Sequence, residues 1–119
     1  MLETDTQVVS EKLLDTHPQK AFFIAEDSHG IALGFIHLEP GKDYYNHGLH
    51  GHIANLIVSP DAEGHGVGQL LLEKAEEWAR NQGFRWLTLS VFAQNRRARE
   101  LYQRLGYGED IIKCIKVLN

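Results

Sequence analysis

Three glycines at alternate positions separate an apolar run from an amphipathic segment. The apolar run Ile53–Val58 stops at Pro60, and Gly64, Gly66 and Gly68 follow it. Glycine lets a backbone approach a ligand closely and adopt positive φ angles. A glycine turn that opens a helix also leaves several N–H groups free at the positive end of the helix dipole. The pattern predicts a site for a phosphate or diphosphate, with a tight connection that binds nothing as the alternative.

The spacing of this turn differs from two better-known phosphate motifs. A Walker loop ends in Gly-Lys-Ser/Thr, whereas this turn ends in Gly-Val-Gly-Gln. A dinucleotide fingerprint needs Gly-x-Gly-x-x-Gly, and the spacing here is Gly-x-Gly-x-Gly. The turn itself therefore does not identify its ligand.

Histidines are the second group with chemical potential. His50 and His52 stand two positions apart, so a strand would place both imidazoles on one face. An imidazole with a pKa of about 6.5 can accept a proton near neutral pH. Together with His47 and His65, these two histidines also suggest a metal site. A catalytic zinc site, however, needs three protein ligands, and Cys114 is remote in sequence. We therefore expect no metal.

The composition limits the class of protein. The 119 residues suit one domain spanning 1–119, and 43% hydrophobic with 24% charged residues is ordinary for a soluble chain. A net charge of −4 argues against a nucleic-acid partner, so an anionic ligand must be held by local donors. The single Cys114 fits a reducing compartment. With neither a membrane span nor a signal pattern, we expect a cytoplasmic protein.

The elements that must position these residues follow from periodicity and turn residues. After a polar start, the sequence predicts a helix within Val8–Asp15 and strands at Ala21–Ala25 and Ile31–Leu38, the second of which is closed by Glu39-Pro40-Gly41. A polar loop at 42–51 leads to the central strand and to a helix that ends at Gly83, whose one apolar face holds Val67, Leu71, Ala75, Trp78 and Ala79. The chain then continues with a strand at Trp86–Phe92, a helix capped by Asn95 and ended by Gly106, and terminal strands within Tyr107–Leu118.

Two strand–helix units in succession indicate an α/β fold. They imply neighbouring strands with helices packed across the sheet. The glycine turn then lies at the carboxyl end of its strand, where such sheets bind ligands.

At this point the chain resembles a known family, the GCN5-related N-acetyltransferases. The likeness runs from about His52 to Tyr107. It is carried by the central strand with its glycine turn, by Asn95-x-x-Ala98-x-x-Leu101-Tyr102, and by Leu105-Gly106-Tyr107. The resemblance implies a mixed twisted sheet with a V-shaped splay between the two central strands and helices on both faces. It also implies direct transfer from acetyl-CoA to an amine of a small molecule or peptide, in a family where homodimers are common.

The resemblance also implies roles for individual residues in holding acetyl-CoA. The pantetheine arm would lie along the central strand like an added strand, with the Leu56 N–H toward the thioester carbonyl. The residues so implied are Leu56, Ile57 and Val58 for pantetheine, Gly64, His65, Gly66, Val67, Gly68 and Gln69 for the diphosphate, and Asn95 for the arm. From spacing alone, Asn95 could equally be only a helix cap.

Two residues carry the chemistry that the resemblance implies. Tyr102 matches the tyrosine that protonates the departing thiolate, which suits a phenol with a pKa of about 10 and a thiol with one of about 8.5. From spacing alone it could be a core residue. His52 matches a position where some members carry a Glu base. The base stays open between His52, a water-mediated route and a set of rivals, which are His50, Asp43, Tyr44, Tyr45 and His47.

Two departures from the family pattern are visible. The family's turn begins with Arg or Gln, whereas this turn begins with Glu63, whose carboxylate would repel a diphosphate. The part before Val8 is shorter than the family's, so one acceptor wall would be missing, supplied by another subunit or lost in a shortened chain. The alternative function is a non-catalytic module that binds acyl-CoA or a partner.

Some surface residues keep two readings. Arg96, Arg97 and Arg99 form either a solvated face or contacts to the 3′-phosphate of CoA. The stretch 42–45 could recognise a cationic acceptor through a carboxylate and ring faces.

Overall fold

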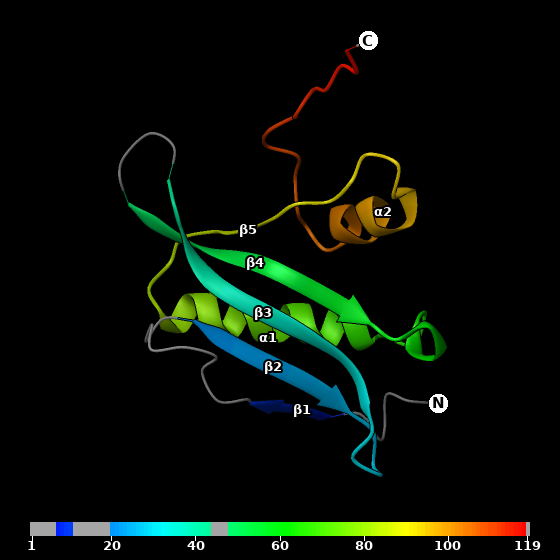
Figure 1. Cartoon of the computed structure of the whole chain (residues 1–119). Coiled ribbons are helices and arrows are strands. Elements are labelled where there is room, and N and C mark those ends of the chain that lie inside the picture. Colours follow the sequence, from blue (N-terminus) through cyan, green and yellow to red (C-terminus); the bar gives the residue numbers. More distant parts are fainter. Residues whose placement is uncertain (1–6, 11–19, 44–47, 119) are drawn as a thin grey trace.

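A computed structural model describes residues 7–10, 20–43 and 48–118 (Figure 1). The elements are, in chain order, β1 (Gln7–Ser10), β2 (Ala21–Glu26), β3 (Ala32–Lys42), β4 (Leu49–Val58), a short 3-10 helix (Pro60–Ala62), α1 (Val67–Asn81), β5 (Leu87–Leu89) and α2 (Arg96–Arg104). The five strands form one sheet in the order β1-β2-β3-β4-β5. The first four are antiparallel and β5 runs parallel to β4, so the predicted mixed α/β fold is confirmed.

Helix α1 crosses one face of the sheet and makes the core (Figure 1). Its predicted apolar face is buried throughout: Val67, Leu71, Ala75, Trp78 and Ala79. Side chains of Ile36, Leu38 and Ile53 from the sheet are buried in the same cluster. The helix ends as predicted, because Gly83 follows it with a φ of +81°.

Strand β4 and the edge strand β5 pair over a short stretch and then part. Strand β5 pairs with β4 only at Gly51–Ile53. From there β4 continues to Val58 with β3 as its only strand partner in the described chain. The point of parting coincides with a β-bulge, because Leu38 pairs with Ile53 and His37 with Asn55, which leaves Ala54 without a partner. This geometry confirms the predicted splay.

A glycine fixes how closely β4 approaches α1 at the paired stretch. A Cβ built on Gly51 would lie 2.9 Å from the Trp78 ring and 3.0 Å from Leu87. Because no side chain fits there, β4 and β5 can rest directly on the end of α1. This close packing holds the start of the splay in place.

The N-terminal half differs from the prediction in two places. Residues 8–10 belong to strand β1, not to a helix, since Val8 and Val9 pair with Ala25 and Ile24 of β2. The rest of that predicted helix lies outside the described residues. The turn predicted at Glu39-Pro40-Gly41 is wrong because β3 runs on to Lys42. Pro40 is tolerated there because β2 begins opposite Leu38, so among the described residues this part of β3 pairs with β4 alone.

The C-terminal half also differs. The strand predicted at Trp86–Phe92 is only three residues long, because β5 leaves the sheet after Leu89. The terminal strands predicted within Tyr107–Leu118 are absent from 107–118, which run away from the sheet (Figure 1). Their apolar side chains, among them Ile112 and Ile115, are exposed and pair with no described strand. Within the described ranges, no helix has the length and apolar character needed to cross a membrane.

Candidate active site

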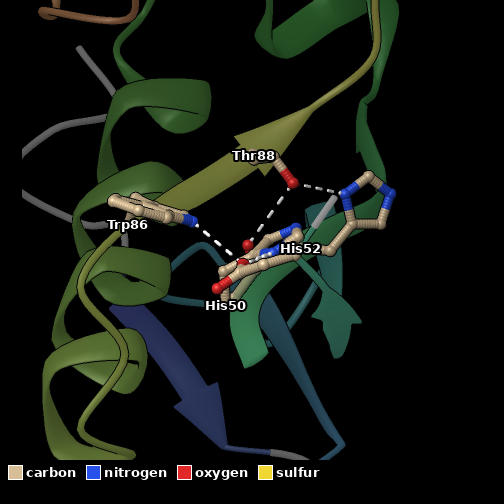
Figure 2. Close-up of polar contacts among 6 residues, drawn as sticks. His50, His52, Trp86 and Thr88 are labelled. Carbon is tan, nitrogen blue, oxygen red and sulfur yellow. Dashed lines mark hydrogen bonds and ion pairs between the residues drawn. The ribbon is translucent and has the colours of Figure 1, made fainter. Parts of the chain in front are cut away.

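Two of the histidines lie where β4 and β5 pair (Figure 2). His52 stands opposite Thr88 in the pairing, and its Nδ1 lies 2.8 Å from Thr88 Oγ1. The same hydroxyl donates to the carbonyl oxygen of Gly51 at 3.5 Å. His52 is half-buried, and its Nε2 has no hydrogen-bond partner among the residues that the structure describes. The ring is therefore anchored at one nitrogen and available at the other.

The surroundings of His52 favour its neutral form. Burial lowers the pKa of His52 below its usual 6.5, and the positive charge that His50 can carry lowers it further. The carboxylate of Glu39, which stands opposite His52 in β3, acts against this and raises the pKa. Because burial is the largest cause, the imidazole is neutral at pH 7 and can accept a proton.

His50 is held in a different way. Its Nδ1 lies 2.6 Å from Asp43 Oδ1, and Trp86 Nε1 donates to the same oxygen at 3.2 Å (Figure 2). The residue is 8% exposed. Its Nε2 lies over the backbone of Gly41, where an added Cβ would be 2.7 Å away. Both ring edges are thus covered, and the geometry fits a structural ion pair better than a proton acceptor for an incoming substrate.

The other residues considered as the general base fall into two groups. Asp43 is engaged by His50 and Trp86. Tyr44, Tyr45 and His47 lie outside the described residues.

The glycine turn exposes main-chain donors at the start of α1. Gly64 and Gly66 have φ angles of +81° and +85°, which glycine adopts without strain. In the described part of the chain, the N–H groups of Gly64 and Gly66 bond to no backbone carbonyl, and those of Val67 and Gly68 are free as in any first helical turn. The N–H of His65 is engaged, donating to Ala62 at 3.3 Å. Unpaired N–H groups at the start of a helix are the kind of donors that can hold an anion.

A cation from the second helix lies beside this turn. Arg97 Nη1 is 3.6 Å from Glu63 Oε2, and Arg97 Nη2 would be 3.5 Å from a Cβ on Gly64. Arg99, by contrast, bonds to Glu109 at 2.6 Å. Arg97 therefore offsets the negative charge of Glu63 at the position where an anion would bind.

Helix α2 positions two residues with predicted roles, Asn95 as its N-cap and Tyr102 within it. Asn95 Oδ1 accepts from the N–H of Ala98 at 3.2 Å, which confirms the predicted cap. The Tyr102 ring is half-buried and 6.1 Å from the ring of Tyr107, whose hydroxyl donates to Glu76 at 3.1 Å. Burial raises the pKa of Tyr102, so its hydroxyl stays protonated.

The structure does not bring all predicted site residues into one contact group. Tyr102 packs against the hydrophobic core beyond the parted strands, and it makes no hydrogen bond or ring contact with His52. The main chain of Leu56, Ile57 and Val58 lies between these two groups in sequence, along the edge of β4 that β5 has left.

A metal ion finds no ready set of ligands. Within the described ranges, no three side chains of His, Cys, Asp or Glu are grouped so that they could share one ion. His47, one member of the predicted histidine group, lies outside those ranges.

Sequence reasoning missed three features of the site. These are the contact of Thr88 with His52, the approach of Arg97 to Glu63, and the Asp43–His50 pair. The first two join residues far apart in the chain, and the third joins the two ends of the β3–β4 loop. One signal was available for Thr88, a polar residue that alternates with Leu87 and Leu89 in a short strand. The other two depend on loop and helix placement, for which the sequence carries no periodic signal.

Known proteins resemble this chain in sequence. The model of the acetyltransferase (GNAT) family matches residues 2–107. An uncharacterised N-acetyltransferase of Bacillus subtilis, YhfO, is 35% identical over 97 residues, which cover 82% of this chain and 64% of YhfO. A mycothiol acetyltransferase of Paenarthrobacter aurescens is 30% identical over 108 residues, covering 87% of this chain and 32% of that protein. The chain thus spans less than two thirds of each relative.

Solved structures agree with this match. A putative acetyl transferase from Pyrococcus furiosus superposes with a TM-score of 0.77 at 29% identity, covering 83% of this chain and 66% of the other. The aminoglycoside N-acetyltransferase AAC(6′)-Iy in complex with CoA superposes with a TM-score of 0.70 at 26% identity, covering 84% and 78%.

Proposed function

Because the chain belongs to the acetyltransferase (GNAT) family, we propose that it transfers the acetyl group of acetyl-CoA directly to a primary amine of a small molecule or peptide. The observation that carries the proposal is the open edge of β4, which leads from the histidine pair to a turn of unused main-chain N–H groups. A thioester with a long polar arm and a diphosphate matches both parts of this surface.

The donor would be held by main chain more than by side chains. The backbone of Leu56, Ile57 and Val58 presents an unpaired strand edge, which suits the amide-rich pantetheine arm. The diphosphate would lie at Gly64–Gln69, with Arg97 alongside, and the Asn95 side chain would contact the arm. When bound, acetyl-CoA supplies an activated acyl carbon, and the Leu56 N–H would stabilise the negative charge that develops on its carbonyl oxygen.

His52 is our candidate for the general base. An alkyl ammonium must lose a proton before its nitrogen can attack, and Nε2 of a neutral, half-buried His52 can accept it. His50 is less suitable because Asp43 and the Gly41 backbone cover its ring.

Tyr102 is our candidate for the general acid. As the new C–N bond forms and the C–S bond breaks, the sulfur leaves as a thiolate that needs a proton. Burial raises the pKa of Tyr102, so its hydroxyl carries a proton to give. The attacking nitrogen becomes cationic as the C–N bond forms and loses its second proton to solvent. The phenolate regains a proton from solvent and His52 releases its proton there, so one proton is set free overall.

Small amines are the substrate class that the relatives favour. Proteins of similar structure include an aminoglycoside N-acetyltransferase and a glucosamine-6-phosphate N-acetyltransferase. We include peptide amines because nothing in the described site limits the size of the acceptor. We also propose that residues 1–119 act as one domain in the cytoplasm. We further propose that the chain forms a homodimer, which light scattering of the purified chain tests.

The test combines a binding measurement with a turnover measurement. Calorimetry with CoA reports binding, and an amine panel containing an aminoglycoside, glucosamine 6-phosphate and a lysine peptide reports release of the CoA thiol. Because Cys114 is exposed and would react with a thiol reagent, the assay uses Cys114→Ser. Binding with turnover supports the enzyme. Binding without turnover on any amine supports a non-catalytic module that binds acyl-CoA. No heat at millimolar CoA contradicts the enzyme and leaves only a module that binds a partner.

A further inference from the structure

One hydroxyl contacts the candidate base, and neither the family match nor the sequence patterns assign it a role. Thr88 Oγ1 lies 2.8 Å from His52 Nδ1, within a parallel pairing that sets the two residues opposite each other (Figure 2). The contact is inside the stretch where Gly51 holds β4 and β5 against α1. Its geometry is therefore tied to the close packing of β4 and β5 on α1.

The direction of this hydrogen bond follows from the second contact of the hydroxyl. Thr88 Oγ1 also lies 3.5 Å from the carbonyl oxygen of Gly51. A carbonyl can only accept and a hydroxyl has one proton, so a hydroxyl that donates to Gly51 is left as an acceptor toward the imidazole. The contact to Gly51 is long for an O–H···O bond, so it favours this orientation of the hydroxyl proton without fixing it. In this orientation Nδ1 of His52 is the ring nitrogen that carries hydrogen.

We propose that Thr88 is a positioning residue that holds His52 as its Nδ1–H tautomer, so that Nε2 keeps the lone pair facing the acceptor; this inference rests on the proposed base role of His52. In a neutral imidazole one nitrogen donates and the other accepts, and the partner of the first selects the second. Nε2 has no partner among the described residues, so Thr88 alone sets the choice.

The consequence for proton transfer is direct. In the Nδ1–H tautomer, Nε2 takes a proton from the substrate ammonium while Nδ1–H stays bonded to Thr88, and the resulting imidazolium keeps that bond. In the opposite tautomer, Nε2 carries hydrogen and cannot accept. The ring would have to exchange its proton with solvent before each turnover.

Nitrogen NMR measures the tautomer without any turnover. The chain has seven histidines, so the His52 signals are assigned by comparison of ¹⁵N-histidine-labelled protein with the His52→Gln variant. At pH 8, where the ring is neutral, we expect a protonated Nδ1 and an unprotonated Nε2. Thr88→Val keeps the shape of the side chain and removes the hydroxyl, so it should shift His52 toward the Nε2–H form. Thr88→Ser restores the hydroxyl and should restore the wild-type signals.

Kinetics then connect the tautomer to the reaction. Thr88→Val should lower kcat about 10- to 100-fold, the range found when the partner of a functional imidazole is removed, with KM for acetyl-CoA unchanged. Thr88→Ser should recover most of the rate. Ser90→Ala is the matched control, because it removes a hydroxyl two positions along the chain that makes no contact with a histidine among the described residues.

The outcomes separate this inference from the function on which it rests. A wild-type His52 in the Nε2–H form, or a tautomer unchanged in Thr88→Val, overturns the inference even if the enzyme is active. The wild-type spectrum decides this even if Thr88→Val does not fold. A tautomer that shifts as expected while His52→Gln keeps full activity leaves the Thr88 contact intact and instead removes His52 from the base role.

Discussion

The carboxylate of Asp43 lies 2.6 Å from Nδ1 of His50, although a hairpin loop separates the two residues in the chain. Both side chains are 11% exposed, so the pair is largely withdrawn from water. It closes the β3–β4 hairpin directly beside the residue that we propose as the base. The Asp43–His50 contact is therefore part of the packing that surrounds His52.

Removing one member of this pair should destabilise the fold more than removing a surface ion pair. Asp43→Ala leaves His50 and the Trp86 N–H without their acceptor, and we expect the free energy of unfolding to fall by about 3 kcal/mol. Glu109→Ala breaks the equally short but exposed contact with Arg99 and should cost less than about 1 kcal/mol. Urea unfolding of the two variants measures the difference. Equal losses of unfolding free energy in the two variants would mean that the Asp43–His50 pair stabilises the fold no more than an exposed ion pair does.

The pH dependence of transfer should report the His52 imidazole. Burial lowers its pKa below 6.5, and the neutral ring is the active form. Activity should therefore hold through neutral pH and decline only as the pH falls below that lowered pKa. His52→Gln should remove this acid limb and lower kcat/KM about 100-fold. A pH profile measured on saturating acetyl-CoA checks both points, and an unchanged acid limb in His52→Gln would assign it to another group.

Replacing the phenol should slow transfer without weakening donor binding. Tyr102→Phe keeps the ring and its packing, so we expect kcat to fall by about 10²- to 10³-fold while the Kd for CoA stays constant. Tyr107→Phe is the matched control, because it removes a hydroxyl from the neighbouring ring 6.1 Å away. That variant loses the bond to Glu76, worth about 1 kcal/mol, and should keep its kcat. A fully active Tyr102→Phe would exclude the role of general acid.

A side chain at the glycine turn should affect stability and binding separately. Gly66 and Gly83 have nearly equal φ angles, +85° and +81°, and a Cβ at either would meet nothing within 4 Å. Gly66→Ala and Gly83→Ala should therefore lower stability by a similar amount, about 1 kcal/mol. Only Gly66→Ala disturbs the donors at the start of α1, so it alone should weaken CoA binding in calorimetry. Equal CoA affinities in both variants would exclude the turn as the diphosphate site.

The charge of Glu63 should oppose donor binding. Glu63→Gln removes a carboxylate from the turn and frees Arg97, whose guanidinium lies 3.6 Å away. We expect CoA to bind about two- to fivefold more tightly, an effect that fades at high salt because both groups are exposed. Arg97→Gln should act in the opposite direction, and Arg96→Gln, one position earlier on α2, should have little effect. Weaker binding by Glu63→Gln would show that the carboxylate supports the turn.

Local patterns predicted those parts of the fold that depend on local physics. The buried face of α1, its end at Gly83 and the Asn95 cap all follow from helical periodicity, positive φ and a side-chain acceptor. The length over which the parallel strand β5 pairs does not follow from local patterns. Trp86–Phe92 has the alternation of a longer strand, but β5 stops at Leu89 because β4 bends away from it.

The site shows the same division. His52 and the glycine turn could be proposed from sequence because their residue types carry a chemical meaning at a given spacing. The alternation of Thr88 with Leu87 and Leu89 gave its face of the strand, but its contact with His52 depends on the register between two strands. The strand at Gln7–Ser10 was mistaken for a helix because a short apolar pair has no clear period, and its pairing with β2 decides the outcome.

The unpaired Ala54 shifts the alternation of β4 by one position. Ile53 lies buried before it and Leu56 packs on the core after it, an odd interval that an unbroken strand would place on opposite faces. Deleting this one alanine would exchange inside for outside over half of the strand, turning either the imidazole of His52 or the aliphatic group of Ile57 toward the interior. We therefore expect β4 to tolerate almost no insertion or deletion at Ala54, whereas substitutions that keep the length of the strand can be tolerated.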